Sequence, residues 1–249
     1  LSMGDRVVAA SNQGAGEWGS YAEFVLCAAE RTVRLPPSVT LRDAATLPTA
    51  GMTAWEAVFD VGATRPGSCV LVNGGAGGTG SFAIQLARMA GARVAATCSA
   101  GNADYVRGLG AERVIDYRTV KISDAVRHWA PEGADLAIDT VGQGTLIDAP
   151  AFMRRGGIIA PIATLIANEP TVDAKEANAA GVQVRPTMST FPNQPRQLRG
   201  LVTALAEARI RAPDVTVLPL SETPEAHRRV QAGHVRGKIV LEIDGSLQS

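Results

Sequence analysis

The sequence predicts an α/β protein with a doubly wound parallel sheet at its centre. Between residues 68 and 163, short apolar runs alternate with amphipathic runs. The apolar runs are nearly continuous, which is typical of strands that are buried on both faces of a sheet. Directly after the first of them, five glycines lie within the seven positions from Gly74 to Gly80. So many glycines between a strand and a helix indicate a turn whose backbone is approached closely by another group.

In this central region, the expected strands and helices follow one another without interruption. The strands are expected at 68–72, 92–97, 111–117, 134–141 and 158–163. The helices are expected at 80–91, 102–110, 122–130 and 145–156. This alternation of apolar strands and amphipathic helices is the pattern of a parallel sheet that is covered by helices on both faces.

The two ends of the chain carry shorter elements. Strands are expected at 4–10 and 20–28, a loop at 33–39, and a helical segment at 41–62 that starts after Thr40 as N-cap and is interrupted by Pro48. The expected order after residue 195 is a helix at 195–210, a strand at 212–220, a helix at 224–233 and a strand at 237–243. Because residues 4–8 read as a turn that feeds a strand, we expect the chain to begin in the middle of a fold.

Composition and charge exclude several classes of function. The chain has 249 residues, of which 46% are hydrophobic, and 24 basic residues balance 24 acidic ones. A neutral chain offers no electrostatic footprint for nucleic acid or for an anionic membrane surface. No apolar run reaches the roughly 20 residues that a membrane-spanning helix needs. The three cysteines form neither a disulfide framework nor a CxxC metal motif, so we expect a reducing, cytoplasmic location.

Three nucleotide-binding motifs compete for the glycine string. A P-loop is rejected because Ser81 follows Gly80 where the phosphate-binding lysine should stand. Gly74, Gly78 and Gly80 fit the GxxxGxG pattern of short-chain dehydrogenases. However, the accompanying YxxxK of Tyr117 lies on an expected strand and too close to the glycines. We therefore reject this motif as well.

The third motif, a Rossmann turn, fits the context. Gly75, Gly77 and Gly80 match GxGxxG, and Gly74, Gly77 and Gly80 match GxxGxxG. The string also follows a strand, opens a helix and precedes a second strand within one βαβ unit. The free N–H groups and the positive end of the helix dipole would then face a pyrophosphate. A tight turn that binds no ligand is the remaining alternative.

The end of the second strand favours NADPH over NADH. NAD sites usually place an acidic residue there, whereas this strand ends in Thr97, Cys98 and Ser99. A carboxylate would repel the 2′-phosphate of NADPH, so its absence indicates that cofactor. Asn102 follows in the loop, and Arg118, after the third strand, is the nearest candidate cation.

Seven blocks of the chain, in order, resemble the medium-chain dehydrogenase/reductase superfamily. These blocks are GDRVV, GSYAEF, AATLPTAGMTAW, VLVNGGAGGTGSFAIQLA, GLGAERVIDYR, AIDTVG and AHRRVQAGHVRGKIVL. They look most like its zinc-independent quinone oxidoreductase branch, the zeta-crystallin-like and reticulon-interacting reductase-like proteins. The resemblance implies a Rossmann dinucleotide-binding domain at 51–189, inserted into a partial, β-rich GroES-like catalytic domain at 1–50 and 190–249.

The resemblance also implies which residues bind the cofactor. It places the pyrophosphate on the loop from Gly74 to Gly80 and the 2′-phosphate at Ser99 and Asn102. Tyr117 would pack on the adenosine end. An ordinary role as a half-buried strand residue remains open for Tyr117. Cys98, beside the ribose site, is either a redox-sensitive thiol or a small strand-end residue, and we favour the second.

The nicotinamide end is expected near Thr53 and Val141, although both could be ordinary helix and core residues. The strand end at 162–164 would receive the carboxamide. The complete set of expected cofactor-binding residues is Thr53, Gly74, Ala76, Gly77, Gly78, Thr79, Gly80, Cys98, Ser99, Asn102, Tyr117, Val141, Ile162, Ala163 and Thr164.

Two departures from the superfamily pattern bear on activity. Thr49 stands where the zinc-dependent branch has a catalytic cysteine, and the lobe with four closely spaced cysteines is absent, so we expect no metal. The segment that normally supplies the opening strands and a substrate loop is also missing from the sequence. His128, His227 and His234 have no partner at catalytic spacing and are interpreted as surface or boundary residues.

The resulting hypothesis is a metal-independent NADPH-dependent reductase of quinones or α,β-unsaturated carbonyls, with catalytic residues unknown. The alternative is an NADP-binding protein without turnover, or a truncated one, that retains the Rossmann domain. The expected partners are a small-molecule substrate and a second copy of the chain. The resemblance implies a homodimer formed by pairing of the outer strand of the sheet, at 182–191.

Overall fold

The computed structural model describes residues 1–11, 19–162, 170–187 and 193–243. The chain divides into two compact units, which are described separately. Unit 1 consists of Leu1–Met52 and Ser189–Ser249, and unit 2 is Thr53–Met188.

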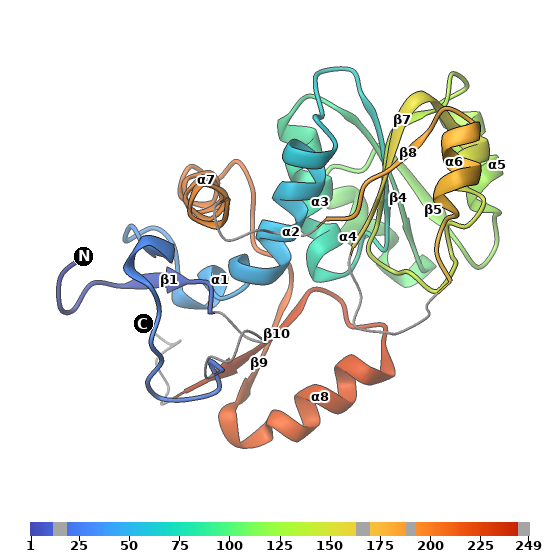
Figure 1. Cartoon of the computed structure of the whole chain (residues 1–249). Coiled ribbons are helices and arrows are strands. Elements are labelled where there is room, and N and C mark those ends of the chain that lie inside the picture. The colour runs from blue at the N-terminus through green and yellow to red at the C-terminus, as the bar shows by residue number, and fades with distance from the viewer. Residues whose placement is uncertain (12–18, 163–169, 188–192, 244–249) are drawn as a thin grey trace. The chain divides into compact units, whose positions relative to one another are not determined.

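Unit 2 is built on one six-stranded parallel sheet (Figure 1). Its strands are β3 (Cys69–Asn73), β4 (Arg93–Cys98), β5 (Arg113–Asp116), β6 (Ala134–Asp139), β7 (Met153–Pro161) and β8 (Gln183–Val184). They lie in the order β5-β4-β3-β6-β7-β8, and every neighbouring pair is parallel. Counted along the chain, this is the order 3-2-1-4-5-6 of a doubly wound dinucleotide-binding sheet. The expected fold class is confirmed.

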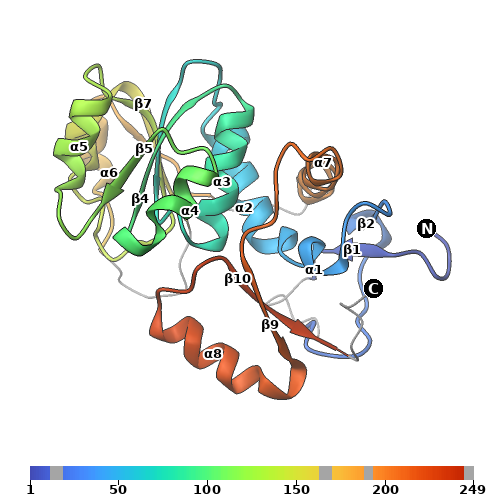
Figure 2. The ribbon, with the colours of Figure 1, turned by 180° about the vertical axis from the view of Figure 1, so that it is seen from behind.

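Helices cover both faces of this sheet. In both views α3 (Gly78–Met89) and α4 (Ala103–Gly108) lie on one face, and α5 (Ile122–Trp129) and α6 (Ala174–Ala179) lie on the other (Figures 1 and 2). The strands between these two layers are apolar on both sides, as the continuous runs predict. Val70, Leu71 and Val72 of β3 are fully buried.

The winding of the sheet defines where a ligand can bind. β3 pairs with β4 on one side and with β6 on the other. The chain leaves β3 through α3 on one face, whereas the 3-10 helix Ala149–Phe152 that follows β6 packs on α5, on the other face. In open α/β sheets the crevice for a ligand lies beyond the carboxyl ends of the strands at this switch point. We call this side of the sheet the carboxyl edge. Asn73, Cys98, Asp116 and Asp139 are the last residues of their strands there.

The helix expected at 145–156 is wrong. In its place the structure has a 3-10 helix, Ala149–Phe152, and β7 starts directly after it. Leu146, Ala149 and Phe152 are all buried, and their spacing of three residues suits a 3-10 turn as well as an α-helix. Gly156, with a φ of +78°, then lies within the strand, where a helix cannot continue.

The described part of unit 1 contains two separate strand pairs. β1 (Val7–Ala9) pairs antiparallel with β2 (Thr32–Arg34). β9 (Val215–Pro219) pairs parallel with β10 (Lys238–Glu242), and α8 (Thr223–Ala232) connects these two strands. The strand expected at 20–28 is wrong, because the structure describes those residues outside any strand. Phe24 and Leu26 in this segment are 89% and 94% exposed. The apolar pattern predicts a strand, but a strand also needs a neighbour that binds its backbone.

The helical segment after Thr40 is less regular than expected. The Thr40 hydroxyl accepts from the amide of Asp43 at 3.0 Å, which confirms this residue as the N-cap of α1 (Leu41–Ala44). A π-helical turn that contains Pro48 comes next, then α2 (Met52–Trp55) and a second π-helical turn, Glu56–Val61. Within unit 1, α7 (Gln194–Ala206) packs on the first π-helical turn. Among the described residues, no helix has the length and apolar character that a bilayer crossing requires.

β8 is an edge strand of the sheet and is shorter than the segment expected at 182–191. Arg185 and Thr187 direct their amides toward β7, donating to Ile159 at 2.9 Å and to Pro161 at 3.0 Å. Successive residues of a strand direct their amides to opposite sides, so the amide of Val184 points away from β7, toward the outer edge of the sheet. Pro186 has no backbone N–H to donate. Residues 188–191 of the expected edge lie outside the described residues.

Candidate functional site

The glycine loop joins β3 to α3 at the carboxyl edge, as predicted. Gly77 is the N-cap of α3, and its carbonyl accepts from the amide of Ser81 at 2.8 Å, which closes the first turn of the helix. The Gly75 amide donates to the carbonyl of Thr97 at 2.8 Å and so ties the loop to β4. The first amides of a helix have no partner within it, so the start of α3 offers donors and a positive dipole end to an anion.

The surrounding structure requires a glycine at two of these positions and leaves space for a side chain at a third. Gly74 has a φ of +85°, and a Cβ there would lie 2.5 Å from the hydroxyl oxygen of Thr140. At Gly80 a Cβ would overlap the carbonyl of Gly74, so this glycine permits close packing of helix on strand. At Gly77 the nearest atom to a Cβ would be the Gly74 carbonyl oxygen at 3.5 Å, an ordinary contact.

The open position at Gly77 fits a dinucleotide. In this class of turn the middle glycine lets the backbone approach the pyrophosphate, while the first makes the tight turn and the third packs the helix. The space beside Gly77 is not needed by the protein's own atoms. This cradle, at the start of a 12-residue helix, is therefore suited to a diphosphate.

A network of buried polar side chains supports the loop, and the sequence analysis missed it. Asn73 and Thr97 are 2% and 1% exposed. The Thr97 hydroxyl donates to Oδ1 of Asn73 at 2.7 Å and accepts from the Gly74 amide at 2.9 Å. Nδ2 of Asn73 donates to Asp139 and to Thr145, each at 2.9 Å.

Asp139 extends this network to the turn after β6. Its Oδ1 also accepts from the amides of Val141 at 3.1 Å and Gly142 at 3.0 Å. The network therefore joins β4, β3 and β6 at their carboxyl ends. A signal was present in the sequence, since the apolar strands VLVN, VAAT and AID all turn polar at positions that a parallel sheet brings to one edge.

The expected ribose residues lie at the end of β4. Ser99 is the N-cap of a 3-10 turn, and Nδ2 of Asn102 donates to its hydroxyl at 3.3 Å. Cys98 is 4% exposed. Burial, and then the Asp116 carboxylate, raise the pKa of its thiol and so favour the protonated form over the reactive thiolate. This environment favours the interpretation of Cys98 as a small strand-end residue.

Tyr117 and Arg118 follow directly after β5. The Tyr117 side chain is exposed, and the guanidinium carbon of Arg118 lies 5.7 Å from the centre of its ring. The Arg118 amide donates to the carboxylate of Asp116 at 3.0 Å. The structure thus places an aromatic face and a cation on the same edge of the sheet as the glycine loop.

A further contact missed by the sequence analysis joins α3 to α4. The Ser81 hydroxyl lies 2.8 Å from the Gly77 carbonyl, to which it donates, and 3.0 Å from the hydroxyl of Tyr105. This bond connects the first turn of α3 to the helix that follows the ribose residues.

The residues expected at the nicotinamide end are partly described. Val141 is 42% exposed beyond β6, and the Ile162 amide donates to the carbonyl of Asp139 at 3.0 Å. Thr53 is half-buried in α2. Ala163 and Thr164 lie outside the described residues. The structure therefore gathers the loop residues, the ends of β4 and β5, Val141 and Ile162 at the carboxyl edge, while a role for Thr53 stays a proposal.

The comparisons with known proteins agree with this geometry. A family model described as "Zinc-binding dehydrogenase" matches residues 109–241. The chloroplastic quinone-oxidoreductase homolog of Spinacia oleracea is 30% identical over 262 residues, which cover 97% of this chain and 74% of the relative. The chain belongs to the quinone oxidoreductase branch of the medium-chain dehydrogenase/reductase superfamily.

Other members of the superfamily show the same similarity. The mitochondrial NAD(P)H oxidoreductase RTN4IP1 of Homo sapiens is 30% identical over 245 residues, and the chain spans 61% of its length. The structure of mycobacterial Rv1454c complexed with NADPH superimposes with a TM-score of 0.86 at 31% identity, over 98% of this chain and 75% of that one. The names of two of these relatives state organelles, so the cytoplasmic location stays a prediction.

The family description names zinc, whereas this superfamily member shows no zinc site in the part of the chain that the structure describes. Among those residues, no group of three or more His, Cys, Asp or Glu side chains could hold a metal ion. His227 instead lies 3.3 Å from the hydroxyl of Tyr21 within unit 1. The absence of a metal requirement stays a proposal.

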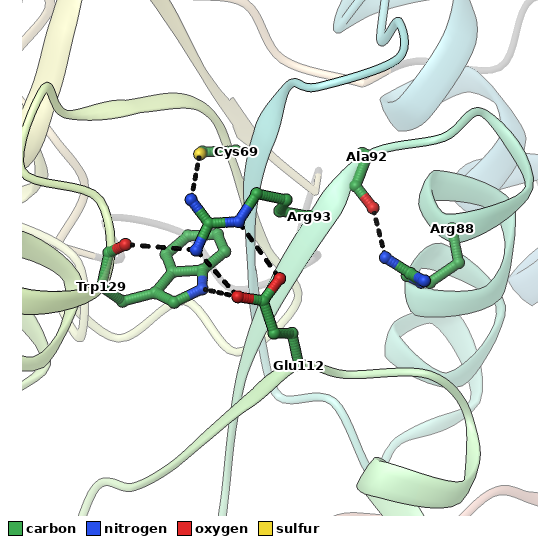
Figure 3. Close-up of polar contacts among 6 residues, drawn as sticks. All are labelled: Cys69, Arg88, Ala92, Arg93, Glu112 and Trp129. Carbon is green, nitrogen blue, oxygen red and sulfur yellow. Dashed lines mark hydrogen bonds and ion pairs between the residues drawn. The ribbon is translucent and has the colours of Figure 1, made fainter.

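A second polar cluster lies at the other end of the sheet, where β3 and β4 begin (Figure 3). Arg93 binds both carboxylate oxygens of Glu112, at 2.8 and 3.2 Å, and its guanidinium carbon is 5.1 Å from the centre of the Trp129 ring. Cys69 lies 3.8 Å from Arg93, but burial raises the pKa of its thiol. The cluster is far along the strands from the glycine loop, and we interpret it as structural.

Proposed function

We propose that this protein binds NADPH at the carboxyl edge of unit 2 and transfers hydride to a quinone or an α,β-unsaturated carbonyl compound. The observation that carries the proposal is the cradle at Gly77, where the open N-terminus of α3 follows a tight glycine turn. The names of its relatives support the same chemistry, since they include NAD(P)H oxidoreductases, quinone oxidoreductase homologs and a trans-enoyl reductase.

The cofactor's diphosphate would lie over Gly77 at the start of α3. Its 2′-phosphate would be bound by Ser99 and Asn102, with Arg118 as the cation. The neutral end of β4 favours NADPH, because an acidic side chain there would repel that phosphate. The exposed ring of Tyr117 offers a packing surface for the adenosine.

NADPH, when bound, supplies the hydride. The protein would contribute orientation and the exclusion of water, which are the main contributions of a protein to hydride transfer. The turn at 140–142 and the strand end at 162–164 would orient the nicotinamide. We assign no residue as a general acid or base, and the reaction as proposed needs no metal.

Binding and turnover are tested separately, because the chain spans only 61% of the length of its human relative. Calorimetric titration with NADP⁺ tests binding, and oxidation of NADPH with 9,10-phenanthrenequinone or with an α,β-unsaturated ketone tests reduction. Binding together with quinone-dependent oxidation supports the full proposal. Binding without turnover of quinones or enones would instead support the alternative of a cofactor-binding protein, and an absence of binding would refute both.

A further inference from the structure

We propose that Asn73 is a positioning residue that holds the glycine turn in the shape required by the cofactor's diphosphate. The proposal rests on the NADPH-binding function given above and identifies the side chain on which the shape of that site depends. At 2% exposure, Asn73 is too deeply buried to contact a ligand itself. Its effect must pass through the groups to which it is bonded.

The carboxamide of Asn73 is the branch point of the network. Its nitrogen faces Asp139, whose carboxylate can only accept hydrogen bonds, so the oxygen must face Thr97. The second N–H bonds to the hydroxyl oxygen of Thr145. Both donors of the carboxamide are therefore used. An aspartate at this position would lose these donors and place a second carboxylate beside Asp139.

The arm through Thr97 fixes the first residue of the turn. A threonine hydroxyl has one proton, and here it points to Oδ1 of Asn73. The hydroxyl oxygen is thereby left to accept from the amide of Gly74 at 2.9 Å. Gly74 has a φ of +85°, and its amide is held by a side chain whose own orientation is set by Asn73.

The arm through Asp139 fixes the neighbouring turn. The same carboxylate oxygen accepts from Asn73 and from the amides of Val141 and Gly142. This turn lies directly against the loop, since the Thr140 hydroxyl donates to the carbonyl of Asn73 at 2.7 Å. One carboxamide thus holds both sides of the switch point, where a dinucleotide binds in this class of sheet.

The test uses two variants of Thr97, each of which differs from threonine in one group only. Thr97→Val keeps the shape of the side chain but removes the hydroxyl, whereas Thr97→Ser keeps the hydroxyl. Asn73→Ala removes the branch point. Each variant is measured by calorimetric titration with NADP⁺ and by hydrogen–deuterium exchange of residues 74–80 in the free protein. Melting temperature is used to verify that each variant is folded.

We expect Thr97→Val and Asn73→Ala to raise the Kd for NADP⁺ at least fivefold and to speed exchange in the loop. Thr97→Ser should stay within twofold of the wild type in both measurements. The double variant Asn73→Ala/Thr97→Val should bind NADP⁺ no more weakly than the weaker-binding single variant. Both substitutions break the same chain of hydrogen bonds, from Asn73 through Thr97 to the Gly74 amide.

A folded Asn73→Ala or Thr97→Val protein with wild-type Kd and wild-type loop exchange would overturn the inference. Equal losses in Thr97→Ser and Thr97→Val would overturn it too, because the hydroxyl would then not be the group that matters. If the wild-type protein does not bind NADP⁺, the proposed function fails, and the exchange measurement alone decides whether Asn73 holds the loop.

Discussion

Gly80 in the first turn of α3 packs against the carbonyl of Gly74 so closely that a Cβ at Gly80 would overlap it. A Cβ at Gly77, three residues earlier, would make only an ordinary contact with that carbonyl. The absence of a side chain therefore matters at these two positions for opposite reasons. Gly80 serves the packing of helix on strand, whereas Gly77 leaves room for a ligand.

The first prediction concerns stability without ligand. Gly80→Ala should lower the free energy of unfolding by roughly 1–3 kcal/mol, because backbone atoms must shift to admit the methyl group. Gly77→Ala should lower it by at most about 1 kcal/mol, the cost of alanine in place of glycine at an N-cap. Urea unfolding followed by circular dichroism measures both. A larger loss for Gly77→Ala than for Gly80→Ala would show that the roles are reversed.

The second prediction concerns cofactor choice. The protein should bind NADPH more tightly than NADH, and Ser99→Asp should narrow or reverse the difference by repelling the 2′-phosphate. Ser99→Asn is the matched control, because it has nearly the same size without the charge. Fluorescence titration with both cofactors gives the ratio of Kd values. A wild-type preference for NADH would contradict the argument from the end of β4.

The third prediction concerns metal. Protein purified without chelators should contain well under one zinc per chain by elemental analysis, because Thr49 stands where the zinc-dependent branch has a cysteine. Dialysis against EDTA should leave the Kd for NADP⁺ unchanged. A stoichiometric zinc that survives dialysis would mean that other residues of the chain bind it.

The fourth prediction concerns pH and the ion pair in Figure 3. Hydrogen bonds from Arg93 lower the pKa of Glu112. Folding therefore favours the carboxylate, so this stabilisation is complete above the ordinary pKa of a glutamate and is lost as the pH falls through the lowered folded-state value. Because both side chains are about 40% exposed, at 44% and 42%, its magnitude should stay below about 1 kcal/mol.

Glu112→Gln tests this prediction. The variant should be less stable than the wild type at pH 7, and the difference should shrink as the pH falls below about 4, the range of an ordinary glutamate. Arg107→Gln, at an exposed pair within α4, is the control and should show a smaller effect. A difference that grows on acidification would have the wrong sign for this pair.

The fifth prediction concerns association. We propose a homodimer through the outer edge of β8, where Val184 directs its amide outward. Val184→Pro removes that donor, whereas Val184→Ala removes side-chain packing but keeps the amide. Sedimentation velocity should show a shift toward monomer for the proline variant only. A wild-type protein that is monomeric at micromolar concentration would contradict the proposal.

Most strands and helices of unit 2 could be predicted because each depends on local patterns, but α6 was not expected. Continuous apolar runs mark buried strands, and the glycine string marks the turn at Gly74–Gly80. The helix expected at 145–156 failed because buried residues three apart, such as Leu146 and Ala149, are shared by 3-10 and α-helical patterns. The strand expected at 20–28 failed because pairing, which no local pattern reports, decides whether an apolar segment becomes a strand.

The cofactor loop could be predicted for the same local reason, but the network that supports it could not. Asn73 and Asp139 are 66 residues apart, and Asn73 and Thr97 are 24 apart. Polar residues at strand ends are common, and only the strand order β4-β3-β6 shows that these three meet. The roles of Thr53 and of the segment 163–164 depend on the nicotinamide end and remain predictions.

The most direct test of the central proposal is a calorimetric titration of NADP⁺ into the wild-type protein and into Gly77→Val. Ala179→Val, which also creates a valine but at an exposed position of α6, is the control. We predict one NADP⁺ per wild-type and control chain, and a Kd at least tenfold higher for a folded Gly77→Val, about 1.4 kcal/mol. Equal affinities for all three proteins would remove the glycine loop from the site and contradict the proposed function.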